Sequence, residues 1–327
     1  MNSRILPVNK KMEYEDLHIP VMKKEVMHYL NLKKGDIVFE GTLGGAGHTV
    51  EIIKAIAPTG KLIGVDLDSQ AISTAARKIK NAGLSDYAIL KNDNFSNIKN
   101  ILRESSVKSI NGFLLDLGLS SMQIDESGRG FSYLKNEQLD MRFTPSEGIK
   151  ASDILNEYPE EQLREIFYKY GEEKWSARIA KNIADYRISK KIELAGELVD
   201  IIKRSIPLKF QYQSGGHPAK RVFQAIRIEV NAELENLKKV LKDCIEIMAP
   251  GGRMVVISYH SLEDRIVKYS FISFEERCTC PRDFPECRCN PVKKGKIITK
   301  KIVVPPDEEI KKNPRSKSAR MRVFEKK

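Results

Sequence analysis

The chain has 327 residues and a formal net charge of +12, with 56 lysines and arginines against 44 acidic residues. Its 41% hydrophobic and 31% charged content is that of a soluble globular protein, and its length allows a large core and two domains. No apolar run approaches the ~18 residues that a membrane span needs, and the first residues lack the apolar core of a signal peptide. We therefore expect a cytoplasmic protein, whose positive charge suits a polyanionic partner such as nucleic acid.

Residues 37 to 116 predict alternating strands and helices. The expected strands are Ile37–Glu40, Leu62–Asp66, Tyr87–Lys91 and Gly112–Asp116. The last of them has the unbroken apolar run of a buried parallel strand. This alternation is typical of a doubly wound α/β fold, in which ligands bind at the carboxyl edge of the sheet.

The turn after the first strand is dense in glycine. It reads Gly41-Thr42-Leu43-Gly44-Gly45-Ala46-Gly47-His48 and lies between an acid, Glu40, and a helix. Because glycine permits φ > 0 and a close approach of the backbone to a ligand, such turns hold nucleotide-like cofactors in doubly wound folds. Asp66 ends the next strand, where a carboxylate can accept both hydroxyls of a ribose.

Two cofactor classes fit a turn of this kind. A NAD-dependent oxidoreductase needs G-x-G-x-x-G, but Val50 stands where the third small residue belongs, and Glu40 would repel a pyrophosphate. An acid at that place suits S-adenosylmethionine, which carries an ammonium, a sulfonium and a ribose but no phosphate. The sequence favours S-adenosylmethionine, with an ordinary strand–turn–helix that binds no ligand as the alternative.

The alternation stops after Leu119. Residues 120–150 are rich in Gly, Ser and Asp, and helices are predicted over Glu160–Tyr170, Glu172–Ile188 and Leu194–Ser205. We expect residues 126–214 to form an all-helical substrate-recognition domain, inserted into an α/β domain made of residues 1–125 and 215–327. The basic and aromatic side chains of these helices suit RNA, although a solvated face over an aromatic core would show the same pattern.

The α/β pattern resumes after Gly215-Gly216. One long helix is expected over Ala219–Met248, and strands follow at Arg253–Ser258, Ile297–Val304 and Ala319–Phe324. A seven-stranded, mostly parallel sheet that ends in a hairpin is the layout of a Rossmann-like class I methyltransferase.

Four of the five cysteines are clustered near the carboxyl end, at Cys278, Cys280, Cys287 and Cys289. Two C-x-C pairs could supply four thiolates to one zinc ion, but zinc sites usually space each pair by two to four residues. A reduced surface loop is the alternative, and we predict no metal.

Several longer motifs are distributed along almost the whole chain. They are Val65-Asp66-Leu67-Asp68, Leu115-Asp116-Leu117-Gly118-Leu119-Ser120-Ser121-Met122-Gln123, Phe223-Gln224-Ala225-Ile226-Arg227, Ser258-Tyr259-His260-Ser261 and Asn313-Pro314-Arg315-Ser316-Lys317. With the glycine turn, they resemble the bacterial 16S rRNA cytosine-N4 methyltransferases, the MraW-type family. The resemblance implies S-adenosylmethionine-dependent N4-methylation of a cytosine in the decoding region of 16S rRNA, with 16S rRNA or the small ribosomal subunit as partner.

The resemblance also implies site residues. Those near the cofactor are Ala46, Gly47, His48, Asp66, Phe95, Asp116 and Gln123. The first three would line its methionine end, Asp66 would bind its ribose, and Phe95 would lie beside its adenine. Because Ala46 stands where glycine is usual, we expect its φ to be negative.

Methylation of cytosine N4 requires help, because the lone pair of this nitrogen is delocalised into the ring. An acceptor on an N4 proton localises that lone pair and takes up positive charge as the bond forms. Asp116 is the candidate, assisted by Ser120, and cofactor binding alone is the alternative for Asp116. We expect His48 to be a structural contact at a helix N-terminus rather than a base. His260 either faces the base or bonds to Glu263 or Asp264.

Three arginines, Arg129, Arg142 and Arg227, could bind phosphates, or could pair with the nearby acids Asp125, Asp140 and Glu229.

The rival functional class is a non-catalytic RNA- or ribosome-binding protein that retained the fold. A homodimer is also compatible with the sequence.

Overall fold

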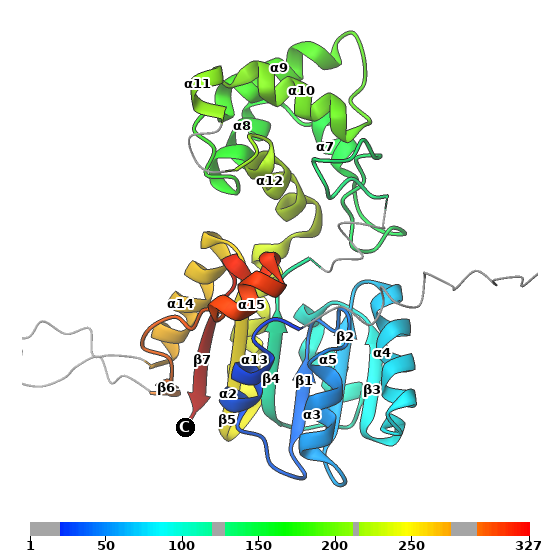
Figure 1. Cartoon of the computed structure of the whole chain (residues 1–327), viewed down its shortest axis with the longest axis vertical. Helices are drawn as coiled ribbons and strands as arrows, with labels where there is room; N and C mark the ends of the chain where they lie inside the picture. Colours follow the sequence, from blue (N-terminus) through cyan, green and yellow to red (C-terminus); the bar gives the residue numbers. More distant parts are fainter. Residues whose placement is uncertain (1–19, 120–127, 212–215, 276–292) are drawn as a thin grey trace, which may run out of the picture.

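The computed structural model describes residues 20–119, 128–211, 216–275 and 293–327. A sheet flanked by helices forms one half of the molecule, and a group of helices lies beyond one edge of that sheet (Figure 1). Ser120, Gln123 and the four clustered cysteines lie outside the described residues.

The described residues form one seven-stranded sheet. Its strands are β1 (Ile37–Glu40), β2 (Lys61–Asp66), β3 (Ala88–Asn92), β4 (Ile110–Asp116), β5 (Met248–Ser258), β6 (Gly295–Ile297) and β7 (Arg320–Lys326). The spatial order is β3-β2-β1-β4-β5-β7-β6, in which β1 to β5 are parallel and β7 runs antiparallel to both of its neighbours. The order reverses between β1 and β4, and a crevice at such a switch point is where open α/β sheets bind ligands.

Helices cover both faces of this sheet. They are α2 (Lys23–Leu30), α3 (Thr49–Ile56), α4 (Ser69–Asn81), α5 (Ile98–Glu104), α13 (Glu233–Ile247) and α14 (Ser261–Glu275). Because strand side chains alternate between faces, Phe39 of β1 packs with α5, α13 and α14, whereas its neighbour Val38 packs with α2, α3 and α4. Phe39 stacks on Phe113 of β4 with ring centroids 5.9 Å apart, which ties the two central strands together.

The remaining helices are α7 (Ala151–Glu157), α8 (Glu160–Lys169), α9 (Ser176–Arg187), α10 (Ala195–Ser205), α11 (Leu208–Gln211), α12 (Lys220–Asn231) and α15 (Asp307–Lys312). Short 3-10 turns lie at η1 (Ser85–Tyr87), η2 (Phe95–Asn97) and η3 (Pro314–Ser318). Helices α7 to α10 and α12 share a separate hydrophobic core, to which Leu163, Ile179 and Phe223 contribute. The boundaries at 126 and 214 stay a prediction, but the packing groups α12, which begins after residue 214, with the other helices of this core.

The structure corrects three sequence-based expectations. The single helix over Ala219–Met248 is two helices, because Ala232 between α12 and α13 is left-handed, with φ 48° and ψ 39°. The helix predicted from Glu172 begins at Ser176, since Glu172 has a φ of 49°. The strand predicted over residues 297–304 covers only Gly295–Ile297, and Val303 makes an isolated bridge to Met321.

None of the described helices combines the length and the apolar character needed to cross a membrane.

Candidate active site

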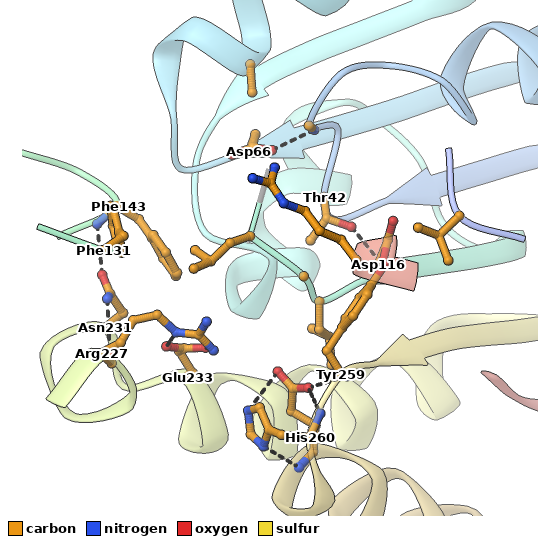
Figure 2. A pocket seen from close by; sticks show the side chains of 18 of the residues that line it. Thr42, Asp66, Asp116, Phe131, Phe143, Arg227, Asn231, Glu233, Tyr259 and His260 are labelled. Carbon is orange, nitrogen blue, oxygen red and sulfur yellow. Dashed lines mark hydrogen bonds and ion pairs between the residues drawn. The ribbon is translucent and has the colours of Figure 1, made fainter. Parts of the chain in front are cut away.

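A cavity of about 1040 Å³ opens at the carboxyl ends of the parallel strands. One wall consists of the glycine turn that follows β1 and of the residues that end β2 and β4, and the wall across from it comes from α12 and the loop before α7. Figure 2 shows Asp66, Thr42 and Asp116 on one side of this space, with Phe131 and Phe143 across from them. The cavity therefore lies between the sheet and the helical group.

The glycine turn gives the cavity an open floor. Gly44 has a φ of 47°, and a Cβ at this position would meet no atom within 4 Å, so the backbone itself faces the open space. At Gly47 a Cβ would lie 2.8 Å from the ring of Pro20, which closes one side of the turn. A ligand can therefore approach the backbone closely at Gly44, whereas Gly47 packs the turn against Pro20.

Ala46 differs from our expectation, because its φ is 57° rather than negative. The turn closes with a hydrogen bond from the Ala46 N–H to the Leu43 carbonyl (2.7 Å), and this closure imposes the left-handed conformation. An alanine there is strained by roughly 1–2 kcal/mol relative to glycine. Its side chain packs on Leu43 and Ala75, and Ala46 is not among the residues that line the cavity, unlike its neighbours Gly45 and Gly47.

Asp66 ends β2 and lines the cavity. One carboxylate oxygen accepts the Gly44 N–H (3.0 Å), and the other accepts the Asp68 N–H (2.9 Å). Burial raises the pKa of Asp66 to about 6, although these backbone hydrogen bonds oppose the rise. Each oxygen retains a second lone pair, so the fixed carboxylate can still accept hydroxyl groups from the cavity.

Asp116 ends β4 and is held from two sides. Its N–H donates to Thr42 Oγ1 (2.7 Å), and its Oδ1 accepts the Tyr259 hydroxyl (2.7 Å). Its Oδ2 lies 4.0 Å from His48 Nε2. Burial raises the pKa of Asp116 to about 6, and the Tyr259 hydrogen bond opposes this rise. Burial and the Asp116 charge raise the pKa of Tyr259, so the phenol is a neutral donor.

Glu40 ends β1 and is 1% exposed, directly behind the cavity residues Gly41 and Thr42. Neither of its carboxylate oxygens has a hydrogen-bond partner among the described residues. Burial raises its pKa to about 8; the nearby Thr49 hydroxyl partly offsets the rise, and the charges of Asp116 and Asp66 add to it. A buried carboxylate without partners beside two other acids is an environment that a cationic ligand would stabilise.

Two further predicted residues line the same cavity. His48 is the N-cap residue of α3 and is 5% exposed. Phe95 begins η2, and a Cβ added to Gly41 would lie 2.9 Å from the Phe95 side chain, so glycine is needed for this contact. The structure therefore brings Gly47, His48, Asp66, Phe95 and Asp116 to one cavity.

The opposite wall is built on α12. Asn231 accepts the Phe143 N–H (2.9 Å) and donates to the Met141 carbonyl (2.8 Å), which holds the loop carrying Phe143 against the helix. Phe143 stacks on Phe131 with centroids 5.7 Å apart, and both rings line the cavity. Arg227 pairs through two nitrogens with Glu233 (2.7 and 2.8 Å), across the break between α12 and α13.

The predicted arginine pairings hold in part. Arg142 pairs with Asp140, as expected (2.7 Å). Arg227 pairs with Glu233 instead of Glu229, because the left-handed Ala232 turns the start of α13 back toward it. Arg129 contacts Asp68 (2.8 Å) in the sheet half of the molecule, whereas the expected partner Asp125 lies outside the described residues.

Sequence reasoning missed Tyr259 and Thr42 as site residues. Thr42 lies within the glycine turn, and Tyr259 directly follows β5, so the rule that strand ends carry the site would have selected both. His260, the next residue, lies 3.2 Å from Glu263 and so has one of the two predicted acidic partners, while it also lines the cavity.

Among the described residues, one trio has spacing that could suit a metal, namely Glu233, His260 and Glu263. Arg227 already binds both oxygens of Glu233, and Glu263 accepts the Tyr259 N–H (2.8 Å). These contacts make the trio part of an ion-pair network.

The parallel sheet with its antiparallel last strand, the switch-point cavity and the acids at three strand ends define a Rossmann-like class I methyltransferase. The chain matches the sequence model of the MraW methylase family over residues 15–327, and it belongs to that family. Members of this family use S-adenosylmethionine as the methyl donor.

Named relatives cover almost the whole chain. A protein from Clostridium botulinum (strain Loch Maree / Type A3), named ribosomal RNA small subunit methyltransferase H, is 47% identical over 311 residues, which are 94% of this chain and 98% of the relative. A protein of the same name from Halothermothrix orenii is 46% identical over 310 residues, 94% of this chain and 98% of that protein. The match to a solved rRNA methylase from Streptococcus thermophilus covers 98% of this chain and 99% of that chain, at 9% identity and a TM-score of 0.40.

Proposed function

We propose that this methyltransferase acts on the RNA of the small ribosomal subunit and methylates N4 of a cytosine in the decoding region of 16S rRNA. The names of relatives at 46–47% identity support the rRNA substrate. The motif resemblance supports cytosine N4 as the acceptor. The observation that carries the chemistry is Asp116, whose carboxylate lies at the cavity with one oxygen fixed by Tyr259.

The residues present fit the methyl donor. Asp66 would accept the ribose hydroxyls, and Phe95 would pack beside the adenine. The open backbone at Gly44 and the ring of His48 would border the methionine part. The unpartnered Glu40 carboxylate is the structural feature that favours a positively charged donor, because a nearby cation would offset the cost of its burial.

The bound donor supplies an electrophilic methyl group, and the protein has to activate and place the acceptor. Ionised Asp116 would accept an N4 proton in a hydrogen bond, which localises the nitrogen lone pair and takes up the positive charge that develops. Tyr259 fixes the position of Asp116 Oδ1, and the carboxylate retains further lone pairs that can accept a hydrogen bond from the base. The aromatic wall of Phe131 and Phe143 limits the entry of water and restricts the orientation of the base.

A methyl-transfer assay with purified small subunits tests the proposal. Tritium from the labelled donor should enter 16S rRNA, and mass mapping should place the product on one decoding-region cytosine as N4-methylcytidine. Asp116→Asn should bind RNA like the wild type and transfer far more slowly. Transfer to another nucleotide would contradict the substrate assignment. A protein that binds RNA but neither binds the donor nor transfers a methyl group would support the non-catalytic alternative.

A further inference from the structure

The walls of the cavity and its mouth differ in charge. The acids Glu40, Asp66 and Asp116 surround the floor, as described above. Four basic residues that also line the cavity are exposed to solvent: Lys220, Lys312, Arg315 and Lys317. We refer to these four residues as the cationic rim. The acids at the floor of the cavity would attract a cationic donor, and the basic residues of the cationic rim would bind a polyanion at the mouth of the cavity.

Two of the rim residues, Arg315 and Lys317, lie in the turn η3, which has a fixed backbone, and Lys312 ends the helix α15 just before it. Ser316 in η3 is fully buried, and its hydroxyl donates to the Asn313 carbonyl (2.8 Å). Ala319, directly after the turn, is 1% exposed and packs in the core. Because Ser316 points inward, Arg315 and Lys317 on either side of it face solvent.

The helix α15, which precedes this turn, is tied to the opposite end of the chain. Glu309 of α15 accepts the N–H of Met22 (2.9 Å), and Met22 is fully buried. The turn that carries the basic side chains is therefore anchored on both sides and needs little ordering when a ligand binds. Preorganisation of this kind is typical of a binding surface, because less conformational entropy is lost on association.

Lys220 completes the rim from the helical side. It begins α12, whose other end carries Arg227 and Asn231 in the far wall of the cavity. Within the described parts of the chain, no acidic side chain lies within ion-pair distance of Lys220, Lys312 or Lys317. Their charges are therefore available to an external anion.

We propose that the cationic rim binds the phosphates that flank the target nucleotide, so that the RNA backbone crosses the mouth while one base enters the cavity. This inference rests on the proposed function and specifies how that site holds its substrate. Backbone contacts by lysine and arginine fix position without reading sequence, so the rim would set affinity and register, and the cavity would select the base.

Salt dependence of RNA binding gives the direct test. The probe is a single-stranded RNA of decoding-region sequence, titrated with the full chain between 50 and 200 mM KCl. Each single-strand phosphate contact contributes a slope of about −0.7 in log K against log salt, so the triple variant K220Q/K312Q/K317Q should have a slope less negative by about 2. Over this salt range, the wild type should weaken about 20-fold more than the variant.

A matched control uses three exposed lysines elsewhere, Lys34 before β1, Lys80 near the end of α4 and Lys108 before β4. The variant K34Q/K80Q/K108Q should keep the wild-type slope, and donor affinity measured by calorimetry should stay within two-fold in both variants. An unchanged slope in the triple variant, an equal change in the control, or a loss confined to donor affinity would overturn the rim assignment. Methyl transfer by the wild type to small subunits is measured separately, so failure of the proposed function is distinguishable from failure of the rim.

Discussion

The buried carboxylate of Glu40 predicts a pH-dependent loss of stability that one substitution should remove. Its pKa is raised from 4.5 to about 8 in the folded protein, so the folded state holds a proton that the unfolded chain releases. A raised carboxyl pKa lowers stability as pH increases, beginning at the unfolded pKa and ending at the folded one. At about 1.36 kcal/mol for each pKa unit, the full effect above pH 8 is up to about 5 kcal/mol.

Two neighbouring acids also lower the stability of the protein as the pH rises, but they do so at lower pH. Burial raises the pKa values of Asp66 and Asp116 from 3.8 to about 6, so their effects are complete near that pH. The interval between pH 6 and pH 8 therefore reports mainly on Glu40. Glu40→Gln has nearly the same shape and no titration, so relative to the wild type it should gain about 2–3 kcal/mol of stability across this interval.

Urea unfolding of the donor-free protein at pH 6, 7, 8 and 9 measures this difference. A cationic donor should favour ionised Glu40, so its affinity for the wild type should rise from pH 6 to pH 8, with proton release detected by calorimetry in buffers of different ionisation enthalpy. Neither effect should occur in Glu40→Gln. A stability difference between wild type and variant that stays constant from pH 6 to pH 9 would refute the reasoning.

Four other substitutions test individual contacts. Asp66→Ala should weaken donor binding by about 1.5–3 kcal/mol, the scale of charged hydrogen bonds, and unchanged affinity by calorimetry would remove the ribose assignment. Asp116→Asn should slow single-turnover methyl transfer by about 10²–10⁴ with unchanged RNA affinity, whereas equal loss of both would indicate a structural role. Tyr259→Phe removes the hydrogen bond that opposes the raised pKa of Asp116, so the acidic limb of the kcat profile should move to higher pH; an unmoved limb contradicts this link. Ala46→Gly should raise thermal stability by about 1 kcal/mol through relief of the positive φ, and a lower melting temperature would argue against strain at this turn.

The sheet and the location of the site could be predicted because both follow from local patterns. Buried parallel strands have continuous apolar runs, and their carboxyl ends meet at one edge, so the terminal acids Glu40, Asp66 and Asp116 had to lie near one another. The placement of these acids required only the order of the strands. Phe95 and His48 were instead implied by the family resemblance, and the structure places them just after β3 and at the end of the glycine turn.

The sequence-based predictions were wrong where tertiary contacts override the local conformational preference of the residues. Ala46 and Ala232 are both left-handed, and alanine gives no local signal for that conformation, because it is a strong helix former. The closed turn imposes it on Ala46. At Ala232 it separates α12 from α13 and allows Arg227 to pair with Glu233. The Tyr259–Asp116 hydrogen bond joins residues 143 positions apart, which no local pattern could predict.

A crystal structure of the protein with bound S-adenosylmethionine tests the central claim most directly. We predict the ribose hydroxyls within hydrogen-bond distance of the Asp66 carboxylate, the amino group on the side of Glu40, and the methyl carbon directed toward the space beside Asp116. A cavity that stays empty at saturating donor, or a donor bound away from the ends of β1, β2 and β4, would contradict the account.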